Sequence, residues 1–199
     1  MIFTNGILRS FCTGNERRPV TYRPWSVGGY SYATNGHIIV RVPRLADVPP
    51  PEDRKIEGTA KQINEWLSKL DGTTRVPVPR DDVPKGKSWS CDKCDGRGSE
   101  HDCPDCRCEC DDCDGTGTCH QPVMVAWRGT HISRDMWRLI AALPESTIAA
   151  SPPLPPIFDH VSFAFAGGVG IVMPMRRPTI PDDVDPVVVS VEDHAQVAA

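Results

Sequence analysis

The amino-acid sequence predicts an α+β protein into which a small cysteine-rich module is inserted. Two segments place apolar residues at helical spacing, and several short segments are rich in the β-branched and aromatic residues that favour strands. Between them lies a stretch that holds eight of the nine cysteines in a chain of 199 residues. A chain of this length can bury one core and still carry a satellite unit.

The first half of the chain is predicted to form strands around one helix. Residues 20–22 and 30–42, on either side of Gly28-Gly29, form a predicted strand pair, and a proline-rich loop follows over residues 43–58. A helix is predicted over residues 59–70, because apolar residues recur there at helical spacing: Ile63, Trp66, Leu67 and Leu70. Residues 76–79 are predicted to return as a short strand.

The second half is predicted to add a strand, a helix and a hairpin. Residues 123–127 form the strand, and Ser133 caps a helix that runs to Leu143 and ends at Pro144. Residues 161–165 and 170–175 form a hairpin around Gly167-Gly168. From Pro178 the tail is expected to be mobile, although residues 187–191 could pair as an edge strand.

The sequence favours a reduced, metal-binding role for the cysteines. No apolar run approaches the ~18 residues that span a bilayer, and the N-terminal residues lack the basic and apolar regions of a secretory signal. We therefore expect a cytoplasmic protein without a membrane partner. Thiols stay reduced in that compartment, so a dense cysteine cluster indicates metal binding before it indicates disulfides.

Charge divides the chain into four parts. Residues 1–87 and 121–177 are the two parts of the body, residues 88–120 are the cysteine-rich module, and residues 178–199 are an acidic tail. The module has nine acidic and three basic residues, and the tail has five acidic residues and no lysine or arginine. Because the whole chain has a formal charge of −4, the body carries +7.

Two octets of the module, residues 91–98 and 110–117, share the pattern CxxCxGxG. Two thiolates separated by two residues can bind one ion, and the glycines permit positive φ and close approach of amides to sulfur. A tetrahedral site with four cysteine ligands has no open position and is therefore structural. The pattern predicts one Zn²⁺ ion bound by Cys91, Cys94, Cys110 and Cys113.

The other cysteines leave the number of ions open. Cys103, Cys106, Cys108 and Cys119 could hold a second Zn²⁺, with His101 or His120 as a substitute ligand. Alternatively, Cys103 and Cys106 could pair with Cys110 and Cys113, leaving Cys91 and Cys94 to Cys119 and a neighbour. Cys12 is expected to be a small buried apolar residue.

The repeated CxxCxGxG resembles the cysteine-rich zinc module of the DnaJ-type co-chaperones. The resemblance covers residues 91–117, with two full repeats instead of that family's four, and the chain has no His-Pro-Asp motif of a J domain. It implies a rigid hairpin that binds a protein partner. The alternative is a chaperone-like polypeptide binder without a J domain.

Two short segments of the body resemble the bacterial β sliding clamps. Residues 32–37, Tyr-Ala-Thr-Asn-Gly-His, are similar to the clamp turn Ala-Thr-Asp-Gly-His, and residues 172–176, Val-Met-Pro-Met-Arg, are similar to the clamp's closing Met-Pro-Met-Arg. The resemblance implies a clamp-like domain, with two helices packed on an antiparallel sheet, acting in DNA replication as a processivity factor. Small clamp-like proteins with such insertions are mainly those of bacteriophages.

A clamp ring has six such domains, so the resemblance also implies a possible homo-oligomer around double-stranded DNA. The basic body is compatible with duplex near its helices. The residues expected to face phosphates are Arg128, Arg134, Arg138, Lys61 and Lys69. No nucleophile elbow, phosphate-binding glycine loop or carboxylate pair beside a histidine is present, so we expect a protein that is not an enzyme.

Overall fold

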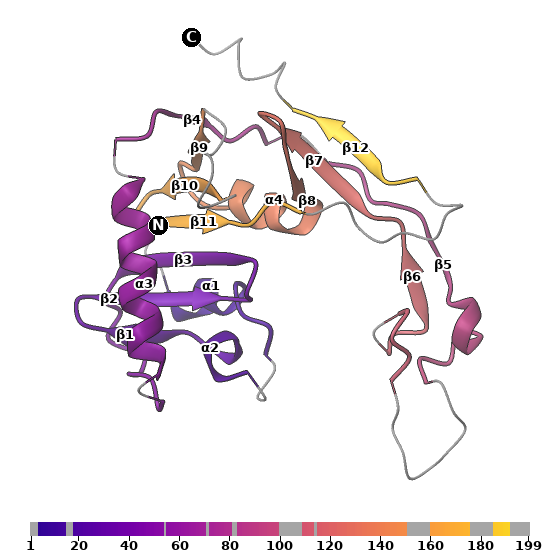
Figure 1. Cartoon of the computed structure of the whole chain (residues 1–199), viewed down its shortest axis with the longest axis horizontal. Coiled ribbons are helices and arrows are strands. Elements are labelled where there is room, and N and C mark those ends of the chain that lie inside the picture. Colours follow the sequence, from indigo (N-terminus) through magenta and orange to yellow (C-terminus); the bar gives the residue numbers. More distant parts are fainter. Residues whose placement is uncertain are drawn as a thin grey trace.

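The computed structural model describes residues 4–14, 18–53, 55–70, 72–80, 83–99, 109–113, 115–150, 160–175 and 185–191. Within these ranges the protein is α+β, with one seven-stranded, one three-stranded and one two-stranded sheet. The first two sheets and the helices form the body, and the two-stranded sheet belongs to the cysteine-rich module, which projects from it (Figure 1). No helix in the described ranges is long and apolar enough to cross a membrane.

Four α-helices lie in the described ranges: α1 (Asn5–Arg9), α2 (Pro19–Tyr22), α3 (Lys55–Lys69) and α4 (Arg134–Ala141). The seven-stranded sheet has the order β1 (Trp25–Val27), β2 (Tyr30–Thr34), β3 (Ile38–Pro43), β11 (Gly168–Val172), β10 (Val161–Phe165), β9 (Thr147–Ala149) and β4 (Arg75–Pro77). All neighbouring strands in this sheet run antiparallel to each other.

The smaller sheets connect the body to the module. The three-stranded sheet has the order β12 (Val187–Ser190), β7 (Val123–Trp127) and β8 (Thr130–Ser133), with β12 parallel and β8 antiparallel to β7. In the module, β5 (Ser88–Ser90) pairs with β6 (Thr118–His120), and a single 3-10 turn covers Asp92–Cys94. Since β6 leads directly into β7, the module continues from the edge of the body.

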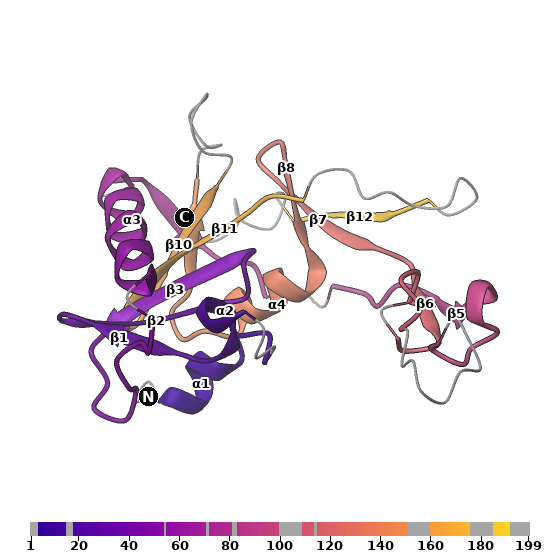
Figure 2. The same cartoon turned by 60° about the horizontal axis from the view of Figure 1, so that its bottom comes forward.

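The seven-stranded sheet is covered by apolar side chains on both faces, because successive residues of a strand point to opposite sides. On β3, Ile39 packs with α3, whereas Ile38 and Val40 pack with the core on the other face. The α3 face contains Ile56, Ala60, Ile63 and Leu67 of the helix; the other contains Leu8, Trp127, Trp137 and Ile140. Figure 2 shows α3 on one side of the sheet and α1 and α4 on the other.

Several sequence predictions are confirmed. The helix predicted over residues 59–70 is α3, although it begins four residues earlier, at Lys55. Ser133 caps α4, where its Oγ accepts a hydrogen bond from the Met136 amide at 3.3 Å. The strand over residues 123–127 is β7, the hairpin is β10–β11, and residues 187–190 form the edge strand β12.

The predicted strand over residues 20–22 is wrong. Those residues belong to the short helix α2, which starts at Pro19, where proline's missing N–H and fixed φ suit the first turn. The strand that pairs with β2 is instead β1, on the other side of Arg23 and Pro24. Residues 30–42 form two strands, β2 and β3, with a turn at Asn35-Gly36 between them, and this is the turn implied by the resemblance of residues 32–37 to the clamp segment.

Four body elements were not predicted: α1, β1, β8 and β9. Each is five residues or shorter, too short for a periodic pattern to stand out. The tail residues 178–184 and 192–199 lie outside the described part of the chain.

Glycines in β11 allow aromatic rings of β10 to cover the centre of the sheet. Gly170 is paired with Phe163, and Gly168 with Phe165. A Cβ atom at Gly170 would collide with the ring of Phe163 and lie 2.5 Å from the carbonyl oxygen of Ile39. The ring thus takes the space that a side chain on β11 would need.

We expect Gly170→Ala to lower the free energy of unfolding by about 1–3 kcal/mol, the usual cost of overpacking a core. Gly29→Ala is the matched control, because a Cβ there meets no atom within 4 Å. Urea unfolding followed by tryptophan fluorescence measures both variants. Equal stability of the two would contradict the close packing of Phe163 on Gly170.

Candidate metal centre

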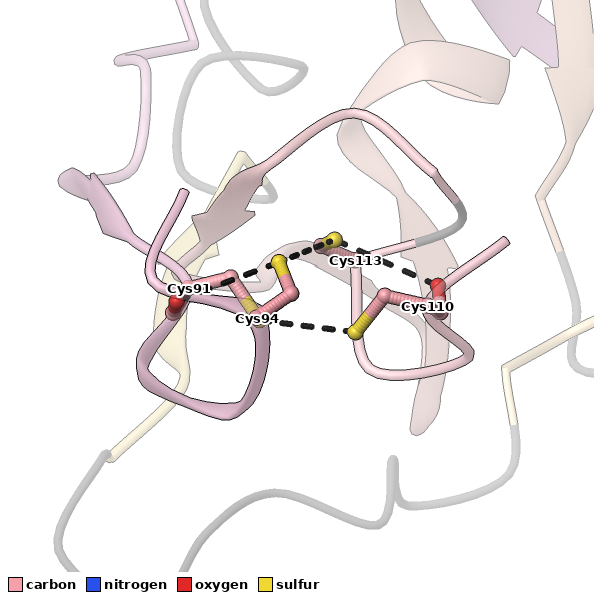
Figure 3. Close-up of side chains that lie close together, drawn as sticks. All are labelled: Cys91, Cys94, Cys110 and Cys113. Atoms are coloured by element: carbon pink, nitrogen blue, oxygen red, sulfur yellow. Dashed lines mark hydrogen bonds between the residues drawn. The ribbon is translucent and has the colours of Figure 1, made fainter. Parts of the chain in front are cut away.

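Four cysteine side chains converge inside the module (Figure 3). Their sulfur atoms all lie within 4.8 Å of one another, and all four residues are buried: Cys91, Cys94, Cys110 and Cys113. Cys91 Sγ lies 3.8 Å from Cys110 Sγ, and Cys94 Sγ lies 3.7 Å from Cys113 Sγ. Each octet therefore supplies two sulfur atoms to one cluster.

The spacing of the sulfur atoms fits ligands of one ion. A tetrahedron with metal–sulfur bonds of about 2.3 Å has edges of about 3.8 Å. A disulfide would require a sulfur–sulfur distance of about 2.05 Å, and all four cysteines are free thiols. The cluster can hold a metal ion such as Zn²⁺.

The two octets have matching backbone hydrogen bonds. In the first, the Gly96 amide donates to the Cys91 carbonyl at 3.0 Å, and the Gly98 amide donates to Cys94 Sγ at 3.2 Å. In the second, Gly115 and Gly117 make the same bonds to Cys110 and Cys113 at the same distances. The Gly98 and Gly117 amides thus stabilise negative charge on the sulfur atoms of Cys94 and Cys113.

The octets are also joined to each other reciprocally. The Cys91 amide donates to the Gly117 carbonyl, and the Cys110 amide donates to the Gly98 carbonyl, both at 2.9 Å. A Cβ atom at Gly98 would collide with the carbonyl oxygen of Gly115, and one at Gly117 with that of Gly96. These glycines also have positive φ, so the octets can approach only with glycine at these positions.

Without metal, the pKa values of the Cys91, Cys94 and Cys110 thiols are shifted in different directions. Burial raises the pKa of Cys91 to about 11 and also raises the pKa of Cys110. At Cys94 burial acts in the same direction, but the Gly98 amide and hydrogen bonds with the neighbouring thiols outweigh it and lower the pKa to about 7. Metal binding at neutral pH must therefore displace at least the protons of Cys91 and Cys110.

A cross-connection that the sequence did not predict lies on the surface of the cluster. Lys93 of the first octet forms ion pairs with Asp111 and Asp112 of the second, with its Nζ 3.5 Å from Asp112 Oδ1. Sequence reasoning missed it, because spacing alone does not show which faces of the two octets meet. The pairs are exposed, so they contribute little stability by themselves.

Cys119 is not one of the four clustered sulfur atoms. It is half-buried on β6, packs against the cluster, and its Sγ lies 3.8 Å from the carbonyl oxygen of Asp112. The alternative pairing of Cys91 and Cys94 with Cys119 is therefore wrong, because Cys110 and Cys113 complete the set. Cys103, Cys106, Cys108 and His101 lie outside the described residues, so the second ion stays a prediction.

The five cations expected to face DNA do not share one surface. Lys61 and Lys69 are exposed on α3, whereas Arg138 is exposed on α4, across the seven-stranded sheet. The two helices therefore cover opposite faces of the sheet and do not line one face together.

The other two residues expected to contact DNA, Arg134 and Arg128, have side chains that make contacts within the body. Arg134 has a side chain only 13% exposed, and its Nε donates to the carbonyl oxygen of Val83 at 3.0 Å. Arg128 lies in the β7–β8 turn with φ of 48°, and its guanidinium carbon lies 5.6 Å from the centre of the Trp127 ring. Both side chains therefore have structural contacts.

No protein-family model, curated protein or solved structure matches this chain. The resemblances to DnaJ-type zinc modules and to sliding clamps thus rest on the short motifs alone.

We expect Cys91→Ser or Cys113→Ser to abolish metal binding and unfold the module, because three thiolates leave the tetrahedron incomplete. Cys119→Ser is the matched control and should keep the metal. Metal analysis of the purified variants gives the stoichiometry, and circular dichroism reports the body helices. Loss of body helicity in Cys91→Ser would contradict a module that folds separately from the body.

We expect the apparent affinity for Zn²⁺ to fall at least about a hundredfold for each pH unit below neutrality. Acid returns protons to Cys91 and Cys110, whose pKa values are raised, and these protons compete with the metal. Affinity therefore rises with pH and is lost on acidification. Competition with a chromophoric chelator across pH measures the slope, and a slope near zero would contradict protonated thiols in the metal-free protein.

Proposed function

We propose that this chain is a non-enzymatic zinc-binding adaptor, in which one Zn²⁺ ion holds a rigid acidic module that binds a protein partner. The observation that carries the proposal is the closed cluster of four buried sulfur atoms. Four protein ligands leave no position for water or substrate, so the ion supports structure and not catalysis. Four thiolates at tetrahedral spacing suit Zn²⁺ better than the oxygen-preferring cations.

The module depends on the ion for its folding. Its buried cluster consists of Cys91, Cys94, Cys110 and Cys113, with Cys119 half-buried beside them, and no aliphatic or aromatic residue belongs to it among those described. So small a unit has too little apolar surface to fold alone. Metal binding supplies about 10–16 kcal/mol in small structural zinc units, which is enough to replace a core.

The surface of the module indicates the kind of partner. Its exposed acidic residues come from both octets and from the position before the second: Asp92, Asp95, Glu109, Asp111 and Asp112. With a formal balance of −6 over residues 88–120, the module repels phosphates and attracts basic protein surfaces. A basic protein partner therefore fits it better than nucleic acid does.

The two other functions receive less support. A clamp-type role in DNA metabolism is supported by the turn at Asn35-Gly36, where Asn35 Oδ1 accepts hydrogen bonds from the amides of His37 and Ile38. The placement of α3 and α4 speaks against this role, because the two helices do not form one basic face. A chaperone-like binder needs exposed apolar surface. Tyr30 and Val188 are the exposed large apolar residues among those described.

The first test is native mass spectrometry, which reports subunit number and bound zinc together. We expect one Zn²⁺ at the four-cysteine cluster of each chain. A purified chain that carries no zinc would contradict the proposal. A hexamer would instead favour the clamp-type role.

The partner-binding step is tested with Asp111→Lys/Asp112→Lys, which reverses charge on the module and keeps all four ligands. We expect proteins captured by the immobilised wild-type chain to be retained at least about tenfold less by this variant, because charge complementarity is lost. Asp47→Lys/Glu65→Lys, which changes two exposed body residues and shifts the net charge by the same amount, is the control for net charge. Equal retention by all three proteins would contradict binding through the module.

A further inference from the structure

The edges of the two body sheets differ in how they are protected. A strand at a sheet edge presents unpaired backbone groups that can pair with another chain. At β1 the Ser26 amide donates to the Pro49 carbonyl at 2.9 Å, and at β8 the His131 carbonyl accepts from Met175 at 2.7 Å. The edge strand β4 contains Pro77, which has no N–H to offer.

The remaining edge, β12, has none of these protections among the described residues. Val187 donates to the Pro122 carbonyl at 3.0 Å, and β12 is parallel to β7. Alternate residues of a parallel strand bond to the same neighbour. Val187 and Val189 therefore bond to β7, whereas Val188 and Ser190 direct their N–H and C=O groups outward.

The side chains of β12 on one face pack against the body, whereas Val188 is an exposed apolar side chain. Val187 and Val189 are half-buried against the body core, and Val191, just beyond the strand, is 1% exposed. Gln121 Nε2 donates to the carbonyl oxygen of Asp185 at 2.8 Å and fixes the start of the strand. Val188, by contrast, is 50% exposed.

We propose that the outer edge of β12 is a peptide-binding site that takes an extended segment of alternating apolar residues flanked by lysine or arginine. The incoming strand would bond to the outward groups of Val188 and Ser190 and lay apolar side chains beside Val188. The basic flanks follow from charge: Asp185 is exposed before β12, and Glu192-Asp193 follow it in the sequence.

Charge also argues against a second copy of this chain as the occupant. A pair of two β12 strands would bring two acidic segments together, since Asp185 precedes the strand and Glu192-Asp193 follow it in the sequence. Like charges directly opposite destabilise a strand pair.

The inference rests on the proposed adaptor function, because it names the partner's segment, but the edge belongs to the body and not to the zinc module.

The test uses a fluorescein-labelled peptide, Lys-Lys-Val-Thr-Val-Thr-Val-Lys-Lys, and fluorescence anisotropy. Val188→Pro removes an outward N–H and leaves the bonds between β12 and β7 in place. We expect it to weaken binding at least about tenfold, whereas Val188→Thr, which keeps the N–H, stays within about twofold of wild type. Equal binding by Val188→Pro, or no binding by the wild-type chain, would overturn the proposal.

A ligand-side control needs no change to the protein. The same peptide with N-methyl groups on alternate residues cannot donate to the edge, and we expect it to bind at least about tenfold more weakly. A peptide with glutamate in place of lysine should lose a similar factor. If either one binds as tightly as the parent peptide, strand addition with basic flanks is wrong.

Cys113→Ser separates this inference from the adaptor proposal. Loss of the metal should leave peptide binding unchanged, because β12 pairs with the body strand β7. If Cys113→Ser abolishes peptide binding, the peptide binds the module and the edge proposal is overturned while the adaptor stands. If the purified wild-type chain carries no zinc yet binds the peptide through β12, the adaptor proposal fails and the edge remains. Dimerisation of the wild-type chain that Val188→Pro abolishes would identify a second copy as the occupant and overturn the edge proposal.

Discussion

A tetrahedron of four thiolates around one ion has a single size, and the structure of the module follows from it. Sulfur atoms about 3.8 Å apart require two chain segments to approach until their backbones touch. The glycines make this approach possible, since Gly98 passes against the Gly115 carbonyl and Gly117 against the Gly96 carbonyl. The cluster thus accounts for the glycine pattern and for the reciprocal hydrogen bonds that join the octets.

The body is stabilised in a different way, and the two parts meet at few residues. Apolar side chains fill both faces of the seven-stranded sheet, whereas the buried cluster of the module is made of cysteines. Gln121 lies directly after the module and joins the segments around its base: its Oε1 accepts from the Lys87 amide at 3.2 Å, and its Nε2 donates to the carbonyl oxygen of Asp185. Under the proposed function, a metal-dependent unit is attached to a metal-independent one, so loss of the ion would disable the module while the body keeps its fold.

The sequence predicted best those features that depend on local spacing. The four ligands follow from two CxxC pairs, and α3 and α4 follow from helical periodicity and a serine cap. One error was local: residues 20–22 have the composition of a strand, yet Pro19 starts a helix there. The other features that the sequence could not predict depend on contacts between distant segments. The opposed placement of α3 and α4, which separates the expected DNA contacts, follows from the alternation of Ile38 and Ile39 on a shared strand.

The position of β12 relates the open edge to the acidic module. Val187 pairs with Val123, only three residues after β6 ends at His120, so the edge begins at the base of the module (Figure 1). A basic segment that pairs with β12 therefore has an end within reach of the module's carboxylates. Two weak contacts made by one chain reinforce each other, because the first raises the effective concentration for the second. An ion that keeps the module rigid, as proposed, would hold the second contact at a fixed distance from the first and lower the entropy lost when both form.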